Sequence, residues 1–228
     1  MWILLTVTVF FVCRYVCQKL NTPLANPLLF SVAIIIPILL ALDIDFDTYY
    51  ADNTFISMLL QPAVVALALP LYEQLPQIRT NWRIIMLACV VGSGLSLFTA
   101  STFAVFFGAD LTLVASVLGK SVTTPIAMEI SSQMGGEAAI AAILVLIAGL
   151  VGALFAYPIY QFLGIQHPIA KGLTMGNVSH ALGTATSAEK DPRDAAFSSL
   201  ALVICGVITS ILAPLAYDYA LWLSIILR

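Results

Sequence analysis

Long apolar stretches without a single charge are the feature that most constrains this chain. Residues 28–42, 138–163 and 195–217 are three such stretches. A bilayer core needs ~20 residues per helical span, and every backbone N–H and C=O group inside it must be paired within the protein. A membrane β-barrel would instead show alternation in ~10-residue segments. The sequence therefore predicts an all-α, polytopic integral membrane protein.

Composition supports this class and excludes several others. Hydrophobic residues make up 61% of the 228 residues and charged residues 9%, whereas a soluble domain needs roughly 25% charged residues to wet its surface. The net charge of −3 gives no reason to expect nucleic-acid binding. Hydrolase motifs such as Gly-x-Ser-x-Gly are absent, and the four cysteines show no metal-site spacing with histidine. We expect no enzyme, no cofactor and no metal.

About eight membrane segments fit into a single domain over residues 1–228. They are 2–17, 28–42, 54–71, 84–107, 111–132, 138–163, 170–188 and 195–217. The first lacks the basic start and the cleavage site of a signal peptide, so we expect a retained helix. If all eight cross the membrane, the positive-inside rule makes cytoplasmic the side with Arg14, Lys19, Arg79, Arg83, Lys190 and Arg193. If 111–132 and 170–188 are re-entrant hairpins, this parity changes.

A weak internal repeat has a period of 57 residues. Gly92, Gly149 and Gly206 follow this spacing in the middle of long apolar stretches, each with a small residue four positions later. Gly119 and Gly176 are also 57 residues apart. One interpretation is a duplicated unit of broken helix and packing helix, as in transporters built from repeats. The other is the general use of small residues where membrane helices pack closely.

Two segments carry glycine or proline beside runs of hydroxyl groups. Segment 111–132 contains Gly119-Lys120-Ser121-Val122-Thr123-Thr124-Pro125, and segment 170–188 contains Gly176-Asn177-Val178-Ser179-His180-Ala181-Leu182-Gly183-Thr184. We predict helix breaks at Gly119, Pro125, Gly176 and Gly183, and at Gln61-Pro62 in the third segment, where a plain kink is the alternative. Broken backbone inside a membrane is tolerated only where protein buries it or a watered cavity solvates it, and it commonly marks a transport site.

Lys120 is the most informative single residue. A lysine near the bilayer centre costs roughly 2.5–3.5 kcal/mol on insertion scales, so an acidic partner or an anionic ligand must offset it. Glu129 is nine residues further on and is a poor intrahelical partner for it. The alternative is that Lys120 lies near an interface and snorkels to water.

Other titratable residues are ambiguous. His180 would suit proton coupling because a histidine titrates near neutrality, but a neutral histidine bonded to a neighbouring helix explains it equally well. Glu73 and Glu189 are either proton carriers or interfacial charges.

The same motifs resemble those of a known family. Residues 60–68, 119–127, 176–185 and 196–202 are similar to the LrgB/CidB family, and the resemblance covers essentially the whole chain. Where typical members have a second glycine-rich stretch after Pro-Ile-Ala, this chain has Met128-Glu129-Ile130-Ser131-Ser132. Glu129 is therefore not carried over as a functional residue.

The resemblance implies two activities. The family was named for antiholin-like control of murein hydrolases and lysis, with an LrgA/CidA-type membrane partner. A related plastid protein is a glycolate/glycerate translocator, and bacterial members are linked to pyruvate uptake. The implied substrate-binding residues here are Lys120, Ser121, Thr123, Thr124, Asn177, Ser179, His180 and Thr184.

Two hypotheses therefore stand for this chain. The first is a secondary transporter of small 2-hydroxy or 2-oxo monocarboxylates in a bacterial inner membrane, elevator-like and coupled to protons. The second is an antiholin-like regulator that acts through its partner. Intramembrane polar residues in two broken segments favour transport. The small-residue helix faces are compatible with a homodimer.

Overall fold

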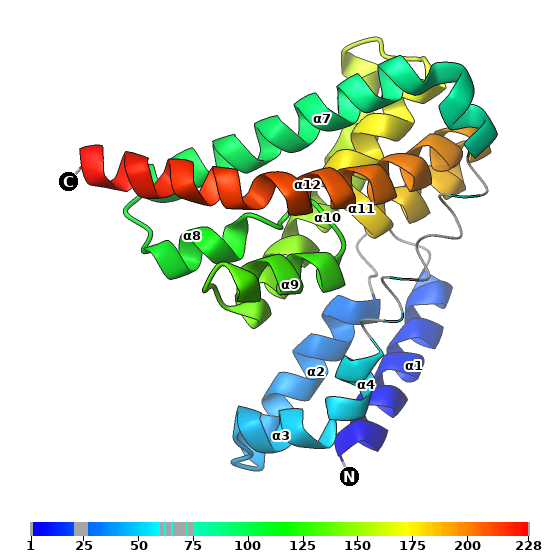
Figure 1. The fold of residues 1–228 in the computed structure, drawn as a ribbon. Helices are drawn as coiled ribbons and strands as arrows, with labels where there is room; N and C mark the ends of the chain where they lie inside the picture. Colours follow the sequence, from blue (N-terminus) through cyan, green and yellow to red (C-terminus); the bar gives the residue numbers. More distant parts are fainter. Residues whose placement is uncertain are drawn as a thin grey trace. The chain divides into compact units, whose positions relative to one another are not determined.

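The computed structural model describes residues 2–20, 27–59, 62, 65, 72 and 75–227. All regular structure in these ranges is helical, which confirms the predicted all-α class. The chain divides into two compact units, residues 1–63 and 64–228, and each is treated by itself (Figure 1). Gln61, one half of the predicted break in the third segment, lies outside the described residues. The single domain over residues 1–228 stays a prediction.

The first unit is a small group of helices. Helix α1 (Trp2–Leu20) packs against α2 (Pro27–Ala41), and the short helices α3 (Phe46–Asp52) and α4 (Thr54–Met58) follow. The Thr6 hydroxyl lies 2.6 Å from the Tyr49 hydroxyl and ties α1 to α3. Asp45 caps α3 by accepting a hydrogen bond from the Thr48 N–H, and hydrogen bonding by Thr48 lowers the pKa of the Asp45 carboxyl.

Four described helices are long and apolar enough to cross a membrane. One is α1, and the other three frame the second unit: α7 (Leu75–Phe106), α10 (Ala138–Phe162) and α12 (Pro192–Ile226). In α7 the candidate span is Arg79–Phe106. They match the predicted segments 2–17, 84–107, 138–163 and 195–217. The segments 111–132 and 170–188 take another form.

Segment 111–132 folds into a hairpin. Helices α8 (Leu111–Val117) and α9 (Thr124–Gln133) would be about 10 and 15 Å long at 1.5 Å per residue, too short for a ~30 Å bilayer core. Gly119 lies against Ala127, where an added Cβ would be 2.6 Å from the Ala127 Cα atom. Near the other end of α9, the Glu137 N–H donates to the Ser116 hydroxyl at 2.8 Å. Helix α9 therefore returns alongside α8, and residues 111–133 form what we call the first hairpin.

Segment 170–188 also folds back on itself. Helix α11 (Pro168–Lys190) is interrupted at His180, whose φ of 41° is rare for a residue with a side chain. An added Cβ at Gly183 would lie 2.8 Å from the carbonyl oxygen of Met175. A continuous helix would separate these two residues by about 12 Å along its axis. Residues 168–179 and 181–190 are therefore the two arms of a second hairpin.

The predicted breaks at Gly176 and Gly183 are wrong in position, because the chain turns at His180. Both glycines instead allow close packing. Gly176 lies in the first arm against the backbone of α12 at Ser198, and Gly183 lies in the second arm against Met175. In the first hairpin, Gly119 does lie in the interruption, and Pro125 lies in the first turn of α9.

The second hairpin packs on the first half of α12. Gly172 lies against Asp194, and further along the arm Gly176 lies against Ala201. The residue numbers rise together on both helices, so the first arm runs parallel to α12 and its tip points toward the middle of α12.

The first hairpin packs on the second half of α12. Ile126 lies against Gly206, whereas Val114 clusters with Ala220 nearer the end of the helix. Figure 1 draws α8 and α9 along one end of α12 and α11 along the other. The two hairpins thus enter from opposite ends of α12 and meet near its middle.

The glycines of the 57-residue repeat receive the hairpin tips. Gly92 of α7 lies against the side chain of Asn177, and Gly149 of α10 lies against the ring of His180. Within the second unit, α7 with the first hairpin and α10 with the second hairpin then form two repeats of opposite orientation. This inverted arrangement is the one found in transporters built from repeats, so it favours the repeat interpretation of the spacing.

Two returning hairpins also change the charge arrangement of the second unit. With α7, α10 and α12 as its spans, one end collects Arg79, Arg83, Lys171, Lys190 and Arg193. Lys171 belongs to this end because segment 170–188 returns to the side from which it starts, which is the re-entrant alternative that changes the predicted parity. The positive-inside rule makes this basic end cytoplasmic.

The close packing at Gly176 can be tested with a glycine that has no such neighbour. Gly176→Ala brings a methyl group to 2.8 Å from the Ala201 Cβ and against backbone, so it should lower the free energy of unfolding by about 1–3 kcal/mol. Gly94→Ala, on α7 with nothing within 4 Å, should be neutral or stabilising by up to about 1 kcal/mol. Thermal unfolding in detergent measures both, and equal effects would contradict the packing described for α11.

Candidate functional site

A cavity of about 750 Å³ lies beside the hairpin tips in the second unit. One wall is α7 between Ile84 and Thr99, and the opposite wall is the first arm of α11 with its preceding residue His167. Lys120 and Ser121, from the interruption of the first hairpin, complete it. The cavity therefore extends from the basic end of the unit to the level where the two hairpins meet.

Lys120 is the cation of this cavity. Its Nζ atom donates to the hydroxyls of Ser96, at 3.1 Å, and Ser121, at 3.0 Å, and these two hydroxyls lie 2.8 Å apart. The ion pairs in the described part of the chain join Lys171 to Asp194 and Arg193 to Asp191, so none involves Lys120. An ammonium group with one more N–H than it uses here is well placed to meet an anion.

The position of Lys120 depends on the break that precedes it. The Lys120 N–H donates to the Val117 carbonyl at 3.1 Å, and the Val122 N–H donates to the Gly119 carbonyl at the same distance. These turns pair backbone groups that would otherwise be unsatisfied in the membrane. They also direct the lysine away from α9 and toward α7.

Asn177 faces the cavity from the first arm of α11. Its amide lies directly against Gly92, where any side chain on α7 would collide with it. Asn177 follows Lys120 by 57 residues, so the two polar residues hold equivalent positions in the sequence repeat. A carboxamide here offers both donors and an acceptor to a ligand.

The remaining predicted binding residues lie at the hairpins but do not line the cavity. Thr123 caps α9 without a side-chain hydrogen bond, and Thr124 begins that helix. The hydroxyls of Thr123 and Ser179 are buried without a hydrogen-bond partner. The Thr184 hydroxyl donates to the His180 carbonyl and lies 2.8 Å from the hydroxyl of Ser198.

His180 forms the turn of the second hairpin. Its ring is buried against Gly149, and Nε2 donates to the carbonyl oxygen of Val145 at 2.9 Å. This is the alternative in which the histidine bonds to a neighbouring helix. Of the two glutamates considered as proton carriers, Glu189 is exposed, and Glu73 lies outside the described residues.

Several residues of this region were not predicted to be functional. Ser96 was noted only as a small residue after Gly92, yet it binds Lys120. Thr99 and Thr174 line the cavity from opposite walls. Thr99 follows Ser96 by three residues and Thr174 precedes Asn177 by three, so each pair of polar residues lies on one helix face. This spacing is the sequence signal that could have identified them. No group of three or more His, Cys, Asp or Glu side chains that could hold a metal occurs in the ranges the structure describes.

Comparison with known sequences now identifies the family. The LrgB-like family model matches residues 6–219, which contain both hairpins and the whole cavity. The chain belongs to the LrgB-like family. With its spanning helices, this LrgB-like protein is a multi-pass bacterial membrane protein.

Relatives of this LrgB-like protein match it almost from end to end. An uncharacterized protein of Haemophilus influenzae is 42% identical over 93% of this chain and 92% of its own length. A protein of Staphylococcus epidermidis named holin-like protein CidB is 34% identical over 93% of both chains. The uncharacterized protein YxaC of Bacillus subtilis is 33% identical over the same shares. No solved structure matches the chain.

Access to the cavity can be tested by cysteine labelling. The four native cysteines are all buried, so the native protein should react only slowly with the reagent. Thr174→Cys, on the cavity wall, should react rapidly with a charged, water-soluble thiol reagent in membrane vesicles. Ser131→Cys, at a fully buried position on the first hairpin, should react no faster than the native protein. Failure of the Thr174→Cys variant to react would contradict a water-filled cavity.

Proposed function

We propose that this protein is a secondary transporter of small 2-hydroxy or 2-oxo monocarboxylates such as glycolate, glycerate or pyruvate. The observation that carries the proposal is the Lys120 ammonium group, which lines the cavity and bonds to hydroxyls without an acidic partner among the described residues. A carboxylate that enters the cavity supplies the missing negative charge and offsets the cost of the half-buried cation.

The surroundings of Lys120 fit a small hydroxylated or keto acid. Ser96, Ser121, Thr99 and Asn177 offer hydrogen-bonding groups for the 2-hydroxy or 2-oxo oxygen, while the rest of the wall is mainly apolar. Pockets of this kind orient a ligand with a few convergent polar groups. Charge selects the carboxylate, and the hydroxyl groups select the neighbouring oxygen.

The inverted hairpins supply a route for alternating access. Their tips meet near the middle of α12, so a ligand at Lys120 would lie beside both hairpins. In the conformation described, the cavity extends toward the basic, cytoplasmic end. Movement of the hairpins against α7, α10 and α12, as in an elevator, would open the opposite side.

A second candidate rests on the names of relatives. Those in Staphylococcus are called holin-like protein CidB, so an antiholin-like regulator of murein hydrolases, acting with an LrgA/CidA-type partner, is the alternative function. A homodimer in the bilayer is compatible with either function. Uptake of labelled glycolate, glycerate and pyruvate into proteoliposomes, with and without that partner, separates the two. Saturable uptake supports the transport proposal, and the absence of uptake in both preparations contradicts it.

The role of Lys120 gives a sharper test. Lys120→Ala should lower glycolate uptake at least about tenfold, since a hydrogen bond to a charged group contributes about 1.5–3 kcal/mol. Lys190→Ala removes an exposed lysine at the end of the second hairpin and serves as the matched control, with uptake unchanged. Equal uptake by the Lys120 variant and the native protein would remove this lysine from the site.

A further inference from the structure

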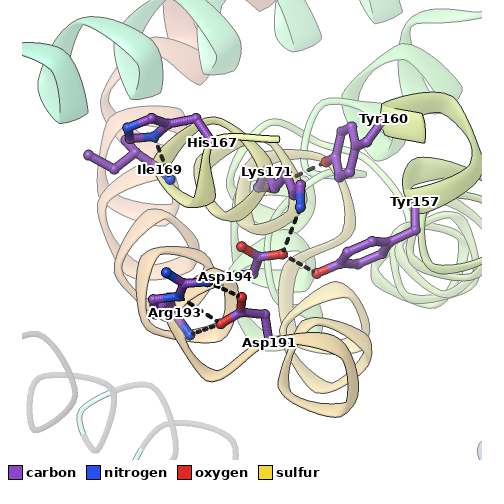
Figure 2. A network of polar contacts seen from close by, with 8 residues as sticks. All are labelled: Tyr157, Tyr160, His167, Ile169, Lys171, Asp191, Arg193 and Asp194. Atoms are coloured by element: carbon purple, nitrogen blue, oxygen red, sulfur yellow. Dashed lines mark hydrogen bonds and ion pairs between the residues drawn. The ribbon is translucent and has the colours of Figure 1, made fainter. Parts of the chain in front are cut away.

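A second polar cluster lies at the base of the second hairpin, away from Lys120. Figure 2 shows Tyr157 of α10 and Lys171 of α11 pointing toward the carboxylate of Asp194 on α12. The Tyr157 hydroxyl donates to Asp194 Oδ2 at 2.9 Å, and Lys171 Nζ lies 3.9 Å from the same oxygen. The Tyr160 hydroxyl donates to the Lys171 carbonyl at 3.2 Å. Three different helices thus converge on one carboxyl group.

Asp194 is completely buried and incompletely paired. Its side chain is 1% exposed, and Oδ1 has no hydrogen-bond partner. Lys171, at 23% exposure, connects the cluster to the basic surface. Buried charges are ordinarily paired and fully hydrogen-bonded, so a carboxylate with one free oxygen and a long ion pair is well suited to accept a proton.

The position of the cluster links it to the cavity. On the first arm of α11, Ala170, Thr174 and Asn177 face the cavity, whereas Lys171 lies on another face and meets Asp194. The same arm is therefore one wall of the substrate cavity and one partner of the buried carboxylate. A change of charge at Asp194 acts on how this arm is held against α12.

We propose that Asp194, with Lys171 and Tyr157, binds the proton that is coupled to carboxylate transport, in place of His180. This inference rests on the proposed carboxylate transport. A proton from cytoplasmic or external water forms an O–H bond on Oδ1, the carboxylate becomes a neutral acid, and its ion pair with Lys171 is broken. The substrate carboxylate enters as an anion and pairs with Lys120. One anion and one proton cross together, and the proton returns to water on the other side.

The charged and titratable groups around Asp194 come from three helices. Tyr157 and Tyr160 face Asp194 from α10, and Lys171 faces it from α11. At the start of α12, Arg193 is bonded to Asp191 at 2.8 Å. The Arg193 guanidinium lowers the pKa of the Asp191 carboxyl to about 2. Asp191 therefore stays ionised at neutral pH and bound to Arg193, whereas the Oδ1 atom of Asp194 has no hydrogen-bond partner.

The test uses the full chain in proteoliposomes that contain a fluorescent pH indicator, with labelled glycolate as the probe. The native protein should acidify the lumen as glycolate enters. Asp194→Asn is permanently neutral, like the protonated acid, so it should keep glycolate–glycolate exchange but lose net uptake and acidification, because an empty return requires deprotonation. Asp191→Asn, three residues away, keeps a helix-capping side chain and should behave as the native protein.

Each outcome decides the inference. Glycolate uptake by the native protein without acidification, or acidification by Asp194→Asn, overturns it while the proposed transport stands. No glycolate uptake by the native protein overturns both. If Asp194→Asn also loses exchange, Asp194→Glu decides: a displaced pH dependence of acidification supports the inference, and an unchanged one overturns it.

Discussion

Interrupted backbone can lie in a bilayer only where protein or water satisfies it, and this constraint organises the second unit. The interruptions at residues 118–123 and at His180 are not left to lipid. They lie at the tips of two hairpins, and the glycine faces of α7, α10 and α12 receive those tips. Because the hairpins enter from opposite ends, both tips reach the middle of the framing helices, where the cavity ends.

The charges of the unit follow from the same arrangement. Most basic side chains lie at one end, where water is available, and they give the unit its orientation. Lys120 is the exception, since the first hairpin brings it to the cavity. Asp194 is the buried carboxyl group at the basic end, where it meets Lys171. The first arm of α11 lines the cavity that contains Lys120, and its Lys171 meets Asp194. The proposed coupling between an anion and a proton would therefore need no long pathway, only movement of one short helix.

Local sequence predicted part of the candidate site. Lys120 was predicted because glycine and hydroxyl groups surround it in a segment too polar for a lipid-facing helix, and Asn177 was predicted from the family resemblance; both line the cavity. The turn at His180 was missed because residues with a side chain rarely adopt a positive φ, so glycine was the expected turn residue, whereas the glycines that looked like breaks serve close packing. Asp194 was missed because an aspartate near a loop ordinarily faces water.

The sequence by itself determined the class of protein, and four of its eight predicted segments match the candidate spans, since lipid imposes these patterns on the chain one segment at a time. It marked segments 111–132 and 170–188 as unusual but left open whether they span the membrane or return. The family followed from the same motifs. Tertiary structure alone decided that those segments fold back, that the hairpins are inverted, and which side chains share the cavity. Such contacts join residues far apart in the chain, and no local pattern of hydrophobicity records which helix a returning arm will meet.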